Sequence, residues 1–341
     1  MKNNKTTISI KNSRRKYILA VGFVFLLIIS ALIFSLFQQG PKPDPSSEKV
    51  IRDKVERYIK DKGADELTEE DFAKITDLSI GDPAIYAVAK KSLSRVELAD
   101  IKLLEKCTNL ETLHIEGVFY PEKSIPKYMR FLGKYGIVDL NKRYVIDLTP
   151  LKSLKKLKNI QMSMVPVKDI KPLSGLVQLK ELHINNIELT DIQPVRGLTN
   201  LESLILYGTK IKNIDVIKGL TKLKNLSLNG MGISDIKAVE NLTNLRSLAF
   251  GYTEVSDLEP LRKLKKLESL SIMSTKVLDL KPIEGLTELQ QLWINSTLIS
   301  DIEPIKSLTK LQTLYMPGCK NITDEQIEDL QKALPDLQIQ R

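Results

Sequence analysis

Leucines recur at a fixed spacing of 22 residues over the second half of the chain. The series runs without slippage through Leu154, Leu176, Leu198, Leu220, Leu242, Leu264, Leu286 and Leu308. Each leucine opens a unit such as 198–219, LTNLESLILYGTKIKNIDVIKG, in which further apolar residues keep their places. A period of this length predicts a repeat architecture with one structural unit per period.

Within each unit, two apolar residues are separated by a single residue, as Leu204 and Leu206 are. This is the period of a strand with one buried face. The wider apolar spacing that follows is typical of a turn and then a short helical or extended segment that leads back to the start of the next strand. Because one unit cannot bury its own leucines, at least three units must stack and share a core.

The repeat, L-x-x-L-x-x-L-x-L-x-x-(T/N)-x-I-x-D-I-x-P-L/I-x-x, resembles the leucine-rich repeat. It is most similar to the 22-residue form of internalin-like bacterial proteins. The resemblance covers about 96–316 and is specific for the fold, much less so for a ligand. It implies an α/β chain that forms a right-handed solenoid with a parallel sheet on its concave side.

Both ends of such a solenoid need caps, because open ends would expose leucines. Residues 48–95 show helical apolar spacing and a helix start signal at Thr68, which predicts a helical N-terminal cap. Residues 317–341 predict a C-terminal cap, with an amphipathic helix from about Asp324 to Leu334 that ends near Pro335.

Small residues hold fixed positions in the repeat, and we assign them structural roles. One position carries a carboxylate that we expect to accept hydrogen bonds from turn backbone rather than to bind a cation, in Asp169, Asp191, Asp235, Asp257, Asp279 and Asp301. Prolines just after it begin the return where no donor is lost, in Pro172, Pro194, Pro260, Pro282 and Pro304. Another position holds Thr209, Thr253, Thr275, Thr297 and Cys319.

Cys319 is therefore expected to be a small buried residue, and Cys107 takes the place of a repeat-opening leucine. The two cysteines would lie about nine rungs apart, which at about 4.8 Å per rung is roughly 40 Å. We expect no disulfide.

The N-terminal region predicts a membrane anchor. Residues 1–16 are a basic cytoplasmic tail, 17–37 form an uncharged stretch long enough to be a transmembrane helix, and 38–47 are a proline-rich linker. The basic cluster before the span places the N-terminus in the cytoplasm and the repeats outside the cell membrane, as a single-pass protein. The alternative is a cleaved signal peptide and secretion.

Charge and composition exclude several classes of function. The net charge of +9 owes much to six basic residues in the tail, and the body is nearly balanced, so nucleic-acid binding is not expected. With two histidines and two cysteines, and neither cysteine next to other ligands, no metal site, cofactor or catalysis is predicted. We expect a monomeric solenoid.

Side chains alternate along a strand, so residues between the inward leucines face the concave surface. One such column contains both histidines of the chain, His114 and His183, and its only tryptophan, Trp293. The predicted partner-binding residues are His183, Ile205, Tyr207, Met273, Trp293 and Tyr315. The alternative is that Trp293 and Tyr315 only pack on each other and on the C-terminal cap.

An insertion of about 25 residues, at about 117–145, interrupts the period. It mixes aromatic and basic residues, and we predict contacts from Tyr120, Tyr128, Arg130 and Phe131. The alternative is that these rings pack against their own repeat.

These patterns predict a membrane-anchored, extracytoplasmic, non-catalytic module. Its concave sheet would bind a protein or peptide ligand, or a glycan, through a few anchor residues. The alternative is a structural or cell-envelope attachment protein without a specific ligand.

Overall fold

The computed structural model describes residues 76–80, 102–116, 147–163, 167, 169–185 and 189–341. By its internal contacts the chain divides into two units, 1–51 and 52–341, and every described residue belongs to the second. The predicted tail 1–16, apolar segment 17–37, linker 38–47 and insertion 117–145 lie outside the described residues. Among the residues that are described, no helix is long and apolar enough to span a membrane.

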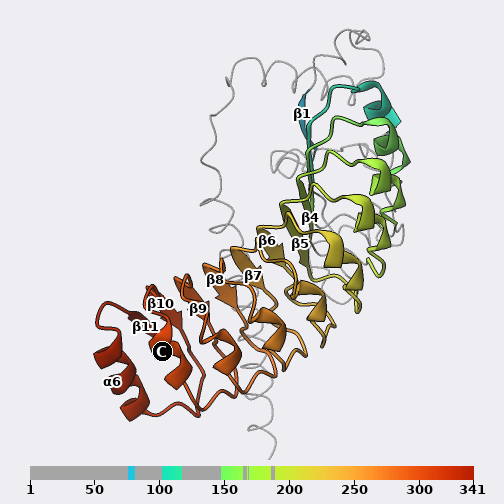
Figure 1. Ribbon diagram of the computed structural model, residues 1–341. Coiled ribbons are helices and arrows are strands. Elements are labelled where there is room, and N and C mark those ends of the chain that lie inside the picture. Colours follow the sequence, from blue (N-terminus) through green and yellow to red (C-terminus); the bar gives the residue numbers. More distant parts are fainter. Residues whose placement is uncertain (1–75, 81–101, 117–146, 164–166, 168, 186–188) are drawn as a thin grey trace, which may run out of the picture. The chain divides into compact units, whose positions relative to one another are not determined.

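One parallel sheet joins the strands in the order of the chain, β1 to β11. Figure 1 shows these strands following one another along one side of the stack, with short helices along the other side. The strands are β1 (Asp77–Ile80), β2 (Thr112–Glu116), β3 (Asn159–Ser163), β4 (Glu181–Asn185), β5 (Ser203–Tyr207), β6 (Asn225–Ser227), β7 (Ser247–Ala249), β8 (Ser269–Ser271), β9 (Gln291–Trp293), β10 (Thr313–Tyr315) and β11 (Gln338–Gln340).

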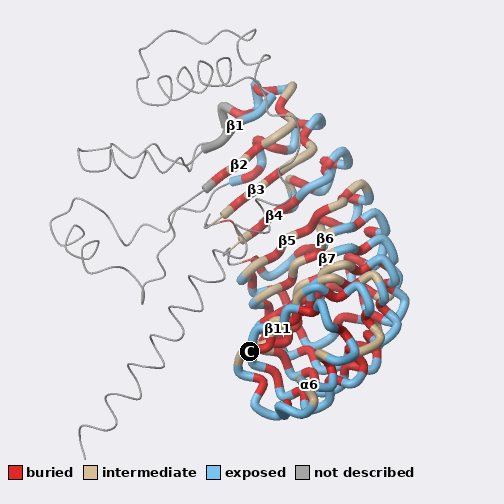
Figure 2. Tube along the Cα trace, turned by 90° about the vertical axis from the view of Figure 1, so that its left-hand side faces the viewer, coloured by how far each residue is buried: buried red, intermediate tan, exposed pale blue. Residues whose placement is uncertain are grey.

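The register follows the 22-residue period, since Leu204 pairs with Leu226 and Leu226 with Leu248. These leucines are completely or almost completely buried, and Figure 2 shows buried positions running through successive rungs. The predicted parallel leucine-rich repeat sheet is therefore confirmed. Each rung covers the leucines of the next, which explains how strands of three residues persist in one sheet.

A short 3-10 helix follows each of the strands β1 to β9 along the chain. The 3-10 helices are η1 (Lys102–Lys106), η2 (Thr149–Ser153), η3 (Lys171–Gly175), η4 (Gln193–Gly197), η5 (Asp215–Gly219), η6 (Lys237–Val239), η7 (Glu259–Leu261), η8 (Lys281–Ile283) and η9 (Glu303–Ser307). Prolines occupy their first turn at Pro150, Pro172, Pro194, Pro260, Pro282 and Pro304. There the missing N–H costs nothing, as predicted.

The repeated aspartates accept a hydrogen bond from the backbone N–H two residues later. In Asp257 the Oδ1 atom lies 2.8 Å from the nitrogen of Glu259, and the same bond recurs at Asp169, Asp191, Asp235, Asp279 and Asp301. The predicted structural role is confirmed. Asn213 replaces the aspartate in one rung and accepts the N–H of Asp215 at 2.7 Å.

Strands that were not predicted stand at both ends of the sheet. Residues 77–80 fall in the range predicted as a helical cap, but they form β1, whose backbone pairs with the edge of β2. At the other end, α6 (Asp324–Ala333) lies within the predicted helical range and begins with a capping box between Thr323 and Gln326. The strand β11, which was not predicted, then pairs with β10.

Both cysteines are free and buried. Cys319 is a small residue of the shared core, where its Sγ lies 3.1 Å from the carbonyl oxygen of Ile294. Burial raises the pKa of the Cys107 thiol to about 11. Because the thiolate is the reactive form, Cys107 is chemically inert at neutral pH.

The aspartate position gives a prediction for stability. Replacing Asp257 with alanine removes the acceptor for the N–H of Glu259, and we expect a loss of roughly 1 kcal/mol in the free energy of unfolding. Asp257→Asn should match the wild type, because Asn213 forms the same bond in its own rung. Urea denaturation midpoints measure both. An asparagine variant as unstable as the alanine variant would mean that the carboxylate charge itself is needed, as a cation site would require.

Candidate binding surface on the sheet

The outward positions of β5 to β10 form a surface without charged residues, which we call the sheet face. It consists of three columns across the rungs. The first column is Ser203, Asn225, Ser247, Ser269, Gln291 and Thr313, the second is Ile205, Ser227, Ala249, Ser271, Trp293 and Tyr315, and the third is Tyr207, Asn229, Gly251, Met273, Asn295 and Pro317. Since 27% of the whole chain is charged, this surface differs clearly from the average.

Trp293 lies on this face between two core residues. Leu292 and Ile294 are fully buried, whereas the indole is half-exposed. Its register partners are Ser271 on one side and Tyr315 on the other. The ring is therefore outside the core, as the alternation predicts, and its N–H forms no hydrogen bond with the described part of the chain.

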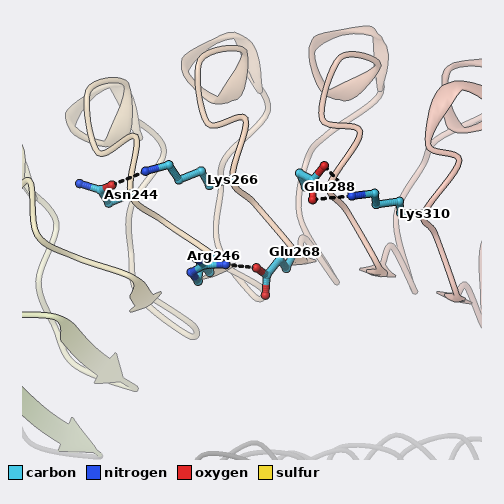
Figure 3. A network of polar contacts seen from close by, with 6 residues as sticks. All are labelled: Asn244, Arg246, Lys266, Glu268, Glu288 and Lys310. Atoms are coloured by element: carbon cyan, nitrogen blue, oxygen red, sulfur yellow. Dashed lines mark hydrogen bonds and ion pairs between the residues drawn. The ribbon is translucent and has the colours of Figure 1, made fainter.

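Charged residues do lie beside the sheet face, at the position just before each of the strands β5 to β8, but they pair with one another across the rungs. Arg246 contacts Glu268, and Lys224 contacts Glu202 at 2.6 Å. Figure 3 shows the Arg246–Glu268 pair. It also shows two pairs formed two residues earlier in the repeat, Lys310 with Glu288 and Lys266 with Asn244. All are substantially exposed, so they add little stability, but they leave the edge of the face close to neutral.

The exposure expected for Met273 is wrong, because this side chain is only 5% exposed. The neighbouring rung carries Gly251 in the same column. A Cβ atom there would lie 2.5 Å from Cγ of Met273, so Met273 occupies the space that the glycine leaves. Met273 belongs to the floor of the sheet face.

The exposure expected for His183 is also wrong, since only 9% of it is accessible. Its Nε2 lies 3.0 Å from the hydroxyl of Ser203 on β5, one column away. Burial lowers the pKa of His183 to about 4, and the neighbouring His114 adds to that shift. The imidazole is neutral at pH 7 and works as a buried polar contact between β4 and β5.

The amide oxygens of the third column are not accessible to a ligand. Oδ1 of Asn229 accepts the N–H of Gly251 at 2.6 Å. Asn295 occupies the same position three rungs further on at β9, where the next residue across is Pro317, which has no N–H. Its Oδ1 is accordingly buried without a hydrogen-bond partner among the described residues. The Asn295 amide has only its nitrogen to offer.

Tyr252 is a further residue of this surface that the alternation of side chains does not reveal. It follows Gly251 directly, is 42% exposed and has a φ of 58°. The same position in other rungs has positive φ in Gly208, Gly230, Ser274, Ser296 and Gly318. A bulky residue in this left-handed conformation is an outlier. The signal in the sequence is an aromatic residue where the other units from 198 onwards have glycine or serine.

Tyr252 interacts electrostatically with two other tyrosines of the face. The pKa of its hydroxyl is raised, first by desolvation and also by Tyr315, while a hydrogen bond with Ser274 opposes the shift. The pKa of Tyr207 is raised by desolvation and by Tyr252. Tyr207, Tyr252 and Tyr315 thus lie along the same face, although they come from β5, the turn after β7, and β10.

Of the remaining predicted residues, Ile205 is half-exposed in the second column. Tyr120, Tyr128, Arg130 and Phe131 of the insertion lie outside the described residues. Among the side chains that are described, no three of His, Cys, Asp and Glu are grouped so as to hold a metal ion.

Comparisons with known proteins agree with the repeat. A family model for leucine-rich repeats (2 copies) matches residues 199–242. No curated protein matches the chain.

Among solved structures, the chain is similar to an internalin, InlF, from Listeria monocytogenes, with 24% identity, a TM-score of 0.56 and coverage of 87% of this chain and 88% of that one. A leucine-rich repeat protein from Leptospira interrogans gives 22% identity, a TM-score of 0.55 and coverage of 81% and 75%. The functional domain of InlJ from Listeria monocytogenes gives 19%, 0.55, and 80% and 64%. The chain thus carries leucine-rich repeats in an internalin-like fold.

The buried imidazole predicts a pH dependence. The pKa of His183 in the folded state is about 4, below its ordinary value of 6.5, so the unfolded chain binds a proton that the folded chain does not between these values. Stability from this group is complete above pH 6.5 and falls as the pH drops towards 4, by roughly 3 kcal/mol at most.

Comparing wild type with His183→Gln isolates this contribution from that of Glu181, whose pKa is raised by burial. Urea midpoints between pH 4 and 7 should fall more steeply for the wild type. Parallel profiles would show that His183 is not held neutral.

Proposed function

We propose that this protein is a membrane-anchored, extracytoplasmic leucine-rich repeat module that binds a protein or peptide ligand through its sheet face, without catalysis. The repeats and the internalin-like fold support a binding role, since stacked rungs commonly present extended recognition surfaces. The specific surface rests on the residues described above and not on the fold.

The observation that carries this proposal is the placement of aromatic side chains on an uncharged, rigid sheet. Trp293 and Tyr315 are neighbours in register, and Tyr252 is exposed in the turn after β7, two rungs before Trp293. Protein interfaces have centres that are rich in tyrosine and tryptophan and poor in charge. A backbone fixed by the parallel ladder loses little entropy on binding, so a few anchors suffice.

Two alternative functions make different demands on the same residues. A cell-envelope attachment protein without a ligand needs only the solenoid, and its function would survive changes on the sheet face. An enzyme would need the His183 and Ser203 pair to act together. In the described part of the chain, no carboxylate hydrogen-bonds the second ring nitrogen of His183, so the pair lacks the third group of a hydrolytic triad.

The membrane anchor and the location of the repeats are part of the proposal. Their support is the uncharged segment 17–37 and the basic residues before it.

We expect a protease added to intact cells to degrade the repeats, because residues 17–37 would hold them outside the membrane. Immunoblotting against the repeat region measures this, and a cytoplasmic protein that stays intact is the control. Repeats that are degraded only after lysis would contradict the proposed location.

Binding itself is tested by changing the anchors together. A photoreactive side chain in place of Trp293 should crosslink the ligand directly and identify it. With that ligand, the triple variant Ile205→Ser, Tyr207→Ser, Trp293→Ala should bind at least ~100-fold more weakly, because single buried anchors cost ~2 kcal/mol each.

The matched control is Leu298→Ser, which removes an apolar residue that is 61% exposed but lies outside the sheet face. Its affinity should equal that of the wild type. Equal binding by the triple variant would favour the attachment role.

A further inference from the structure

In the aromatic part of the sheet face, the free side-chain nitrogens of Trp293 and Asn295 can only donate hydrogen bonds, and the hydroxyl of Tyr315 can donate or accept. The indole N–H of Trp293 can only donate, and it is unbonded within the described residues. The hydroxyl of Tyr315 and the amide nitrogen of Asn295 likewise have no partner there. The two acceptors that would balance them, the Oδ1 atoms of Asn229 and Asn295, are engaged or buried.

A ligand that suits this surface therefore presents acceptors, little charge and flat apolar groups. A proline-rich peptide in the polyproline II conformation has all three properties. Each proline offers a carbonyl oxygen but no N–H, and this helix forms no internal hydrogen bonds, so its carbonyls are free. Proline rings pack on aromatic side chains, which is how aromatic-lined grooves recognise such peptides.

The dimensions agree with this ligand. Tyr207 and Tyr252 lie in adjacent columns two rungs apart, about 9.6 Å at 4.8 Å per rung. One turn of polyproline II rises about 9.3 Å, so rings on the same side of the ligand would meet successive tyrosines. From β5 to β10 the strip spans about 24 Å, the length of about eight residues in this conformation.

Other peptide conformations fit less well. An added strand needs a free edge, and the backbone of β5 to β10 is already paired on both sides. An amphipathic helix needs an aliphatic groove, whereas Met273 is sunk below the surface and only Ile205 and Pro317 remain as accessible aliphatic side chains larger than alanine among the eighteen described positions of the face. Phosphate-bearing ligands need unpaired cations, which the face lacks.

The geometry points to an uncharged, proline-rich segment of a protein as the ligand, lying along the third column from Tyr207 to Pro317 with Trp293 and Tyr315 along its flank. This inference rests on the proposed function and names the ligand class of the same surface. Tyr252 lies in the rung of β7, midway between Tyr207 in the rung of β5 and Trp293 in the rung of β9.

The strained backbone at Tyr252 provides a clean test. Tyr252→Gly places glycine where φ is 58°, as Gly208, Gly230 and Gly318 already do in other rungs, so the fold is not endangered. Trp293, as the only tryptophan of the chain, reports binding through its own fluorescence. The probe is a capped peptide of about eight prolines, added to the full chain in mild detergent.

We expect a saturable change in fluorescence with this peptide and none with a glycine–serine peptide of equal length. Tyr252→Gly should weaken the binding by at least about tenfold, and Tyr315→Phe, which removes one donor, by a few-fold. Leu298→Ser should bind like the wild type. Circular dichroism and urea midpoints verify that each variant is folded.

Four results would overturn the inference. Equal binding by Tyr252→Gly would place the peptide elsewhere. Saturation with a neutral oligosaccharide but not with the proline peptide would assign the face to a glycan. No response to the peptide, while the crosslink from position 293 still identifies a protein, would remove the proline-rich ligand and leave the proposed function standing. Loss of both signals would remove the proposed function as well.

Discussion

The burial of each rung's leucines by the next rung is the interaction on which this structure depends. Leu204 and Leu206 belong to strand β5, yet neither has a place to be buried within its own unit. They are covered only because the same positions recur 22 residues before and after them. Stability is consequently shared between neighbours, and the sheet register follows from the spacing of the leucines rather than from long strands.

This arrangement separates the residues that hold the fold from those that are free to recognise a ligand. Inward positions are fixed as large apolar residues, mostly leucine or isoleucine, and turn positions are fixed by backbone needs, as at Asp257 and Asn213. Apart from positions such as Asn229, Gly251 and Met273, which contact one another across the rungs, outward positions of the strands carry no such demand. The absence of charge there is therefore not required by folding, since Arg246 and Glu268 show that charges are tolerated one position earlier in the same rungs.

The sequence predicts the repeating part of the structure well because its determinants are local and periodic. The spacing of Leu154 to Leu308 is sufficient for the sheet, and the alternation of side chains places Trp293 outside the core. The strands β1 and β11 were missed because they pair through their backbones at the ends of the sheet, outside the leucine period.

The burial of Met273 and His183 was missed for a different reason. Alternation indicates on which side of the sheet a residue lies, but not whether the adjoining rung leaves space beside it. Met273 fills the space above Gly251, and His183 bonds to Ser203, so their exposure depends on residues 22 and 20 positions away. A pattern read within one unit does not contain that information. It requires comparison of the outward residues of neighbouring rungs.

Tyr252 holds a backbone conformation that is unfavourable for its bulky side chain. Glycine is found at this position in three rungs, and a bulky side chain with positive φ costs about 1 kcal/mol or more. The folded core gains nothing comparable, because the ring is 42% exposed and lies outside the leucine layers. Strained backbone that core packing does not offset is typical of positions that contact a ligand. The strained backbone and the exposed ring together therefore favour recognition over a purely architectural role for this part of the sheet face.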